Sequence, residues 1–201
     1  IKRVGNVMID SLFNNLERSK NSTIHSDLNI EKGNYGVLTL HRPSNVDEKD
    51  VFTGIIGALE EIGSKIPLVF PLHPRTKNRA EQFGLTKRLE SIPNIVLTGP
   101  AGYLDFVALM AESKLVLTDS GGLQEETTAL GIPCLTLRDN TERPITVTEG
   151  TNTIVGNDPQ VIIDAAIEII ENGGKAGRIP ELWDGKTATR IADIIEDTIS
   201  E

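Results

Sequence analysis

The sequence contains little of what several classes of protein depend on. Cysteine occurs once in 201 residues, aromatic residues make up 4%, and lysine and arginine (20) are outnumbered by aspartate and glutamate (29). A single cysteine excludes an internal disulfide and weakly indicates a reducing compartment. The net charge of −9 argues against nucleic acid as a partner, because a nucleic-acid surface needs clustered positive charge.

Long hydrophobic runs and targeting signals are also missing from the sequence. No apolar stretch approaches the roughly 20 residues that span a bilayer, and no signal peptide is visible. We therefore expect a cytoplasmic protein with no membrane partner. The chain begins with Ile1 rather than methionine, which raises the expectation that it is a piece of a longer chain. Cys134 follows Pro133 in an apolar run and is expected to be a buried core thiol.

Short apolar segments alternate with amphipathic ones along the whole chain. A chain of 201 residues can form one large domain or two small ones. Strands are expected at 35–40, 67–72, 94–97, 114–118, 134–137 and 153–155. Helices are expected over an opening segment from Val4 to Leu16 and at 47–64, 74–90, 103–112, 122–130, 144–149, 158–172 and 186–199. This alternation predicts an α/β fold, with a parallel sheet and helices on both faces, and we assign residues 1–201 to a single domain.

The most informative stretch is 118–126, with the sequence TDSGGLQEE. It follows an apolar segment expected to be a buried strand and leads into a helical segment closed by Gly131. A strand, a Ser-Gly-Gly turn and a helix start form an anion site, because glycine allows close backbone approach and the first helical N–H groups are unpaired. Ser120 adds a hydroxyl. The alternative is a tight turn before a helix start that favours acids for dipole reasons, and the motif alone leaves the two interpretations about even.

The side chains of Glu125 and Glu126, both inside this expected helix, should point in different directions. Glu126 lies four residues beyond Gly122, roughly 6 Å along the helix at 1.5 Å per residue. That is about the distance from a bound diphosphate to the ribose of the same nucleotide, so Glu126 is a candidate acceptor for ribose hydroxyls. Glu125 is rotated from it by about 100° and is expected to face elsewhere.

Histidine and arginine gather where the expected strands end. His41 and Arg42 follow the first strand, His73 follows the second, and Arg138 and Arg143 follow the fifth. Ligands of open α/β sheets bind outside the carboxyl ends of the strands. A single histidine after a strand is more often a hydrogen-bonded loop residue than a catalyst. Coincidence at several strand ends, beside the Ser-Gly-Gly turn, shifts the balance toward a site.

Other kinds of site lack their motifs. The first turn is His-Arg-Pro-Ser-Asn rather than G-x-G-x-x-G, and the P-loop, H-E-x-x-H and G-x-S-x-G patterns are absent. His41 and His73 are far apart in sequence and have no identifiable carboxylate partners, so we expect neither a metal nor a cofactor. His25 lies in a polar segment and has no expected role. The tract 47–50 (DEKD) is interpreted as an acidic first helical turn.

Taken together, these segments resemble the second half of a non-hydrolysing UDP-N-acetylglucosamine 2-epimerase over nearly the full chain. The resemblance is carried by 4–6 (VGN), 41–47 (HRPSNVD), 118–126, 138–144 (RDNTERP), 150–152 (GTN) and 174–180 (GKAGRIP). The pair of motifs at 118–126 and 138–144 is highly specific. The resemblance implies one half of a glycosyltransferase-B-like architecture, in which two Rossmann-like, three-layer α/β/α domains face each other across a cleft. UDP would bind mainly to the domain present here.

The resemblance also implies roles for individual residues. The implied substrate-binding residues are Arg42, His73, Phe106, Ser120, Gly121, Gly122, Glu126, Arg138 and Arg143. Within this set, the Ser-Gly-Gly turn would hold the diphosphate, Glu126 the ribose, and Arg143 would lie near the phosphates. Phe106 would stack on uracil, although a core phenylalanine on the 103–112 helix is equally consistent with the sequence. His41 matches a histidine needed for catalysis.

The reaction implied is isomerisation of UDP-N-acetylglucosamine to UDP-N-acetylmannosamine. UDP is eliminated to leave a glycal and is then added back with the 2-acetamido centre inverted. The proton at C2 is not acidic, so departure of the diphosphate must lead, and fixed dipoles at the leaving group help most. A base is also required, and the carboxylates that serve the family lie in the first domain, which is missing here.

The implied partners follow from this division. We expect UDP-N-acetylglucosamine and UDP as ligands, an N-terminal epimerase domain as partner, and no cofactor. The resemblance allows a homodimer of the full-length enzyme and implies a place in cell-surface polysaccharide biosynthesis. Three alternatives stay open: a hydrolysing relative, another nucleotide-sugar transferase, or a nucleotide-binding module without catalysis.

Overall fold

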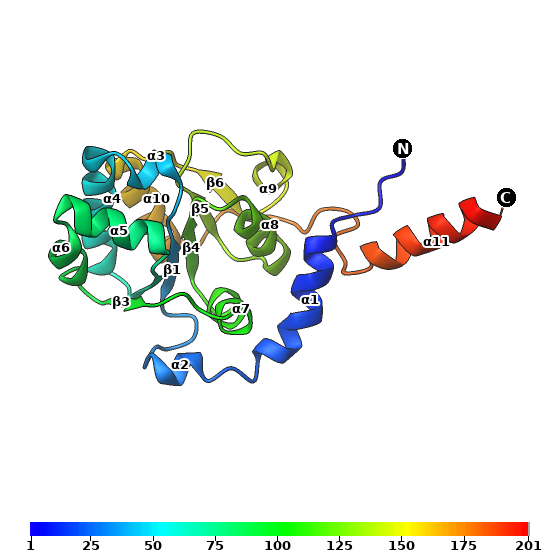
Figure 1. Ribbon diagram of the computed structural model, residues 1–201, viewed down its shortest axis with the longest axis horizontal. Helices are drawn as coiled ribbons and strands as arrows, with labels where there is room; N and C mark the ends of the chain where they lie inside the picture. The colour runs from blue at the N-terminus through cyan, green and yellow to red at the C-terminus, as the bar shows by residue number, and fades with distance from the viewer. Residues whose placement is uncertain (201) are drawn as a thin grey trace.

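A single six-stranded parallel sheet forms the centre of the protein (Figure 1). The structure is a computed structural model that describes residues 1–200. The strands lie in the order β3-β2-β1-β4-β5-β6, and every neighbouring pair is parallel. Their bounds are β1 Gly36–Thr39, β2 Leu68–Pro71, β3 Ile95–Thr98, β4 Leu115–Thr118, β5 Cys134–Thr136 and β6 Asn152–Ile154. The order reverses between β1 and β4, as in a Rossmann-like sheet, and this confirms the predicted α/β class.

Helices cover both faces of the sheet (Figure 1). They are α1 Val7–Ser19, α2 Ile24–Asp27, α3 Pro43–Val46, α4 Lys49–Gly63, α5 Pro74–Phe83, α6 Thr86–Glu90, α7 Tyr103–Ala111, α8 Gly121–Leu130, α9 Pro144–Thr148, α10 Pro159–Asn172 and α11 Thr187–Ser200. The pair α4 and α10 packs on one face, and α1, α7 and α8 pack on the other. Within residues 1–200, no helix combines the length and apolar character needed to cross a bilayer.

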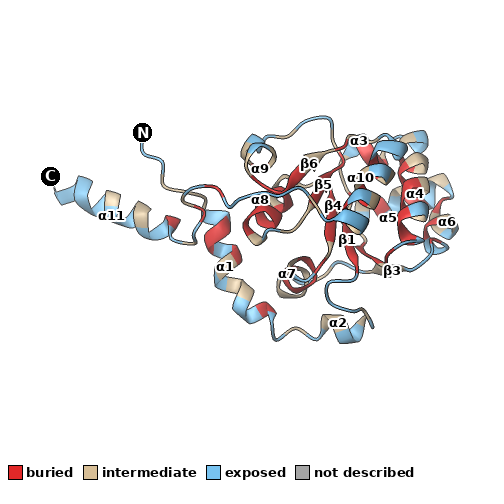
Figure 2. Cartoon of the chain, turned by 180° about the vertical axis from the view of Figure 1, so that it is seen from behind, coloured by how far each residue is buried: buried red, intermediate tan, exposed pale blue. Residues whose placement is uncertain are grey.

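Two apolar clusters, one on each face, hold these layers together. Along β1, Val37 belongs to the cluster under α1 and α7, and Leu38 belongs to the cluster under α4 and α10. This alternation follows from the pleat, which points successive side chains to opposite faces. The strands β2, β4 and β5 are fully buried and β1 nearly so, whereas the edge strand β3 is half-buried (Figure 2). Burial from both sides explains why the central strands read as continuous apolar runs in the sequence.

The expected helices differ from the structure in four respects. The opening helix, expected from Val4 to Leu16, is α1 and runs from Val7 to Ser19. The helix expected at 74–90 is two helices, because Gly84 adopts a left-handed conformation (φ 71°) that ends α5. The helix expected from residue 47 begins at Lys49, and a separate short helix, α3, starts at Pro43. The short helix α2 was not expected. Cys134 is buried and unpaired, as predicted.

The beginning and end of the chain meet beside α1. Gly5 (φ 115°) packs so closely on the carbonyl of Leu182 that a Cβ atom would not fit, and Arg190 Nη1 donates to the Val4 carbonyl (3.2 Å). From this point α11 projects away from the sheet (Figure 1). Its distal part exposes Ile195 and Ile199.

Asp10 of α1 caps the first turn of α11. Its carboxylate accepts hydrogen bonds from the backbone N–H groups of Thr187 (3.1 Å) and Ala188 (2.7 Å). Burial by itself would raise the pKa of Asp10, but these hydrogen bonds outweigh it and hold the pKa below its ordinary value. The ionised carboxylate is therefore the form that holds α11 in place.

We expect Asp10→Ala to release the first turn of α11 while leaving the sheet intact. Loss of a helix cap costs about 0.5–2 kcal/mol. Amide exchange of Thr187 and Ala188 should therefore accelerate, with protection in β1 and β4 unchanged. Asp164→Ala is the control, because the bond that Asp164 accepts is a local one from Gln160 on the same helix, α10. Unchanged exchange at Thr187 in the Asp10 variant would contradict the capping role.

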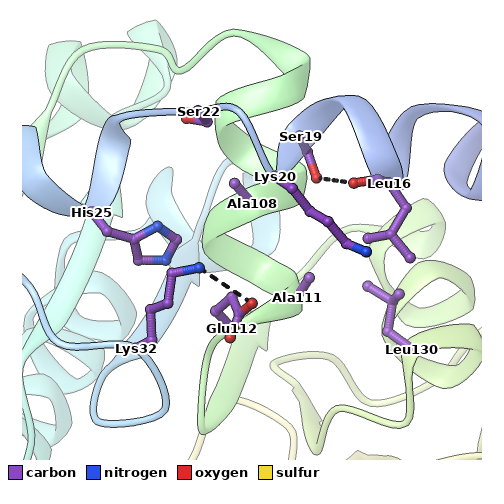
Figure 3. A pocket seen from close by; sticks show the side chains of 10 residues that line it. All are labelled: Leu16, Ser19, Lys20, Ser22, His25, Lys32, Ala108, Ala111, Glu112 and Leu130. Atoms are coloured by element: carbon purple, nitrogen blue, oxygen red, sulfur yellow. Dashed lines mark hydrogen bonds and ion pairs between the residues drawn. The ribbon is translucent and has the colours of Figure 1, made fainter.

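A cavity of about 220 Å³ lies between α1, α2 and α7 (Figure 3). Lys32 Nζ reaches across it to Glu112 Oε1 at 3.4 Å. The His25 ring faces the cavity (Figure 3), and its Nε2 lies 2.9 Å from the hydroxyl of buried Tyr35. That hydroxyl donates to the Leu109 carbonyl (2.5 Å), so Nε2 carries the hydrogen of the His25–Tyr35 bond. His25 therefore connects α2 to the core.

Candidate functional site

The carboxyl ends of β1, β2 and β4 surround a cleft of about 250 Å³. His41, His73, Phe106 and Ser120 all line it. The ring centroids of His41 and His73 are 5.3 Å apart, although the residues are far apart in the sequence. The cleft lies where the strand order reverses, which is where open α/β sheets bind ligands. The structure thus brings together four of the residues predicted from the sequence.

The N-terminus of α8 opens beside this cleft. Ser120 is its N-cap residue, and within residues 1–200 its side chain makes no capping hydrogen bond. The Ser120 N–H is taken by Thr118 Oγ1 (3.0 Å), and the helix begins at Gly121 and Gly122. The first N–H groups of a helix have no intrahelical partner and attract anions. The local geometry therefore suits a phosphate group.

Asp119, a residue that the sequence analysis missed, lies behind His41. Its side chain is fully buried, and Oδ1 lies 2.9 Å from His41 Nδ1. Its other oxygen, Oδ2, accepts the backbone N–H groups of His41 (2.9 Å) and Arg42 (2.7 Å) and the Asn45 side-chain amide (3.2 Å). Burial acts to raise the pKa of Asp119, but His41 and these N–H groups outweigh it and lower that pKa. Asp119 is therefore an ionised anchor for the loop after β1.

The arginines after β5 are paired with acids. Arg138 binds Glu142 with both terminal nitrogens (2.8 and 2.7 Å), which lowers the pKa of Glu142 to about 2. Glu142 Oε2 lies 3.8 Å from the point where a Cβ on Gly121 would stand. Its carboxylate thus rests near the start of α8. Arg42 Nε is buried and has no hydrogen-bond partner within residues 1–200.

Glu125 and Glu126 face in different directions, as helical rotation predicts. Glu125 Oε1 accepts the Asn6 amide (3.0 Å) and lies 3.0 Å from Arg143 Nε. Glu126 accepts the Tyr103 hydroxyl (3.2 Å). Burial is the main cause that raises the pKa of Glu126, the charge of Glu125 adds to it, and the Tyr103 hydrogen bond opposes it. Arg143 is therefore tied to Glu125, and Glu126 lies under Tyr103.

The loop after β2 is anchored by a second ionic group. Asp47 was expected in the first turn of a helix, but it precedes α4 and binds Arg75 Nε (3.1 Å) and Arg79 Nε (2.9 Å). His73 Nδ1 accepts the backbone N–H of Arg75 (3.1 Å) at the start of α5. This bond fixes the His73 ring, which lines the cleft, and within residues 1–200 no hydrogen bond is made by its Nε2. Among residues 1–200, no three His, Cys, Asp or Glu side chains are placed to hold a metal ion.

Comparison with known protein families identifies the family of this chain. A family model described as UDP-N-acetylglucosamine 2-epimerase matches residues 1–196. The chain belongs to the UDP-N-acetylglucosamine 2-epimerase family.

Relatives of this chain are similar to it in both sequence and fold. The curated UDP-N-acetylglucosamine 2-epimerase of Methanocaldococcus jannaschii is 40% identical over 197 residues, covering 96% of this chain and 53% of the relative. The structure of that organism's enzyme in complex with UDP-GlcNAc and UDP matches with a TM-score of 0.82 and 38% identity, covering 96% of this chain and 55% of the other. The chain spans about half the length of the curated relatives it matches.

One curated relative of this chain is named for a different substrate. The UDP-2,3-diacetamido-2,3-dideoxy-D-glucuronate 2-epimerase of Pseudomonas aeruginosa is 40% identical over 167 residues, covering 83% of this chain and 44% of the relative.

The fold agrees with the expected half of a glycosyltransferase-B-like architecture. The roles expected for individual residues of this epimerase-family chain stay predictions. They concern His41, Arg42, His73, Phe106, Ser120, Gly121, Gly122, Glu126, Arg138 and Arg143.

In this epimerase-family chain, Tyr103→Phe should raise the pKa of Glu126 further. The Tyr103 hydroxyl donates to the ionised carboxylate, so its removal favours the protonated form. The carboxyl carbon of Glu126 can be followed by NMR during a pH titration. Glu60 is an internal control, because its lowered pKa depends on Arg88. A downward or absent shift at Glu126 would show that the hydroxyl does not stabilise its charge.

Proposed function

We propose that this chain is the UDP-binding half of a UDP-N-acetylglucosamine 2-epimerase. The complete protein would be an isomerase that interconverts UDP-N-acetylglucosamine and UDP-N-acetylmannosamine by elimination and re-addition of UDP. The observation that carries the proposal is the start of α8, where the Ser120 side chain makes no capping bond within residues 1–200 and borders a cleft that contains His41 and Phe106. Residues 1–201 would act as one nucleotide-binding domain.

The diphosphate would lie on the first turn of α8. The N–H groups of Gly121 and Gly122 and the Ser120 hydroxyl are the donors there, and the helix dipole favours negative charge. Arg143 is held through Nε by Glu125, and its Nη1 donates to the Glu142 carbonyl (3.4 Å), so Nη2 is the nitrogen that would reach a phosphate. Arg138 would join them only after it releases Glu142.

The nucleoside would extend from the diphosphate toward α7. Glu126 lies one turn up α8 and would accept hydrogen bonds from the ribose hydroxyls in place of the one from Tyr103. Phe106 is half-buried in the wall of the cleft, and its ring would pack on uracil. The predicted contacts are thus mostly to phosphate, with one acid and one aromatic side chain for the nucleoside.

The site would act by stabilising UDP as it leaves the sugar. Donors preorganised at the α8 start are worth most where charge develops, which is on the departing diphosphate. His41 and His73 would face the bond that breaks. Removal of the C2 proton needs a positioned base, and we assign that base to a partner domain outside these 201 residues.

The partner would be the N-terminal domain of the same enzyme. Relatives continue for about as many residues again, and both ends of this chain leave the body on the same side (Figure 1). The exposed isoleucines of α11 would pack against that domain. We further propose that the complete protein is cytoplasmic, forms a homodimer and serves cell-surface polysaccharide biosynthesis, and the unpaired Cys134 fits a reducing compartment.

Product analysis separates this function from the open alternatives. A hydrolysing relative would release N-acetylmannosamine and free UDP, whereas the proposed enzyme would form UDP-N-acetylmannosamine. The Pseudomonas relative is named for an epimerase of a diacetamido-glucuronate nucleotide. Assaying the complete protein with both UDP-sugars therefore tests which sugar it accepts.

We expect the isolated chain to bind UDP more tightly than uridine. Most of the proposed contacts go to phosphate, and charge-assisted hydrogen bonds are worth about 1.5–3 kcal/mol each. Isothermal titration calorimetry with the two ligands measures the difference. Equal affinities would remove the α8 start as a diphosphate site.

The isolated chain should not catalyse exchange of the C2 proton. A general base contributes about 10²–10⁴-fold, and closure by a second domain, which excludes water, is also missing. The chain can be incubated with UDP-N-acetylglucosamine in deuterium oxide and the C2 signal followed by NMR. The full-length Methanocaldococcus jannaschii enzyme is the positive control. Exchange at a comparable rate in the isolated chain would place the base within residues 1–201.

A further inference from the structure

The carboxylate of Asp119 is not among the contacts proposed for UDP. It is fully buried, and its two oxygens have separate tasks. Three N–H donors converge on Oδ2, from the His41 and Arg42 backbones and the Asn45 side chain. Oδ1 lies 2.9 Å from His41 Nδ1. Asp119 therefore contacts both the backbone of the loop after β1 and the imidazole ring of His41.

We propose that Asp119 is a positioning residue that holds His41 with its hydrogen on Nδ1 and so presents Nε2 to the cleft as an acceptor. The inference deepens the proposed function, because it assigns His41 a chemical form in the same site. An ionised carboxylate can only accept a hydrogen bond. Oδ1 is buried and has no other hydrogen-bond partner within residues 1–200, and His41 Nδ1 lies 2.9 Å from it. A buried carboxylate oxygen needs a donor, so we place the histidine hydrogen on Nδ1.

His73 has the opposite arrangement. Its Nδ1 accepts the backbone N–H of Arg75, so the hydrogen of its uncharged ring is on Nε2. The two rings face the same cleft at 5.3 Å. His41 therefore offers an acceptor and His73 a donor, and this pair suits a ligand group that both donates and accepts, such as a sugar hydroxyl. The titratable and charged groups placed around His41 are Asp119 at 2.9 Å, the His73 ring at 5.3 Å between centroids, and Arg138, whose charge acts on Asp119.

The donors on Oδ2 predict what Asp119→Asn would do. These three N–H groups need an acceptor, so the amide oxygen of the substituted side chain would take the Oδ2 position. Its NH₂ group would then point at His41 Nδ1, which would have to accept. The hydrogen would move to Nε2, and the lone pair offered to the cleft would be lost. In a serine protease triad the same Asp→Asn change gives the wrong histidine tautomer and lowers kcat by about 10⁴.

The test is long-range ¹H–¹⁵N correlation of the ¹⁵N-labelled protein at mildly alkaline pH, where a bare imidazole nitrogen and an N–H nitrogen have distinct shifts. The chain has three histidines, and His25 provides an Nε2–H reference, because its Nε2 bonds to the Tyr35 hydroxyl. We expect His41 alone to be Nδ1–H, and Asp119→Asn to convert it to Nε2–H with His73 unchanged. Asp47→Asn, which removes the carboxylate behind the other loop, should leave His41 unchanged.

Two outcomes would overturn the assignment of Asp119. One is an Nε2–H form of His41 in the unaltered protein, which decides the question even if Asp119→Asn does not fold. The other is an unchanged His41 in a folded Asp119→Asn variant. UDP titration of the same samples separates this inference from the proposed function: failure of the unaltered protein to bind UDP would contradict the function and leave the tautomer result standing. In the two-domain enzyme, Asp119→Asn should lower kcat by about 10–100-fold, as expected for loss of one hydrogen bond to the sugar, with little change in UDP affinity.

Discussion

Burial of the parallel sheet on both faces is the constraint from which the rest of this structure follows. The strands β1, β2, β3 and β4 send alternate side chains into two apolar clusters, and the polar side chains of the candidate site follow the carboxyl ends of the strands. Asp119, at the end of β4, binds the loop that follows β1. Asn45 of α3, in that loop, donates to both Asp119 and the Leu137 carbonyl next to β5. One buried acid and one buried amide thus join the three loops on which the site is built.

Features encoded by local sequence were predictable. Asp158 caps α10 and Gly173 ends it, as a capping acid before proline and a glycine pair indicate. The strands followed from continuous apolar runs, and the different directions of Glu125 and Glu126 followed from the rotation of a helix. Each of these features is determined by residues that lie within a few positions of one another in the sequence.

Features that depend on distant partners were not predictable in the same way. Asp47 was assigned to a helical turn because its arginine partners lie 28 and 32 residues away. Asp119 was overlooked because its partners lie in the loop after β1 and in α3, and β1 is beside β4 only in the strand order of the sheet. The family resemblance indicated which residues form the site, but not that Arg138 and Arg143 are held by Glu142 and Glu125. The partner of each arginine could not be predicted from the sequence, because in a chain of net charge −9 several acids compete for each arginine.

The contact between Gly5 and Leu182 has a consequence for how this unit can be handled. The segment between them carries the whole sheet, and its two ends lie side by side. A folded unit whose ends meet can be inserted into a host protein or circularly permuted with short linkers, since neither operation has to stretch the chain. Because Trp183 is buried in the cluster under α1 and α7, a cassette that could be transplanted as a nucleotide-binding module would run from Gly5 through Trp183, with α11 left behind.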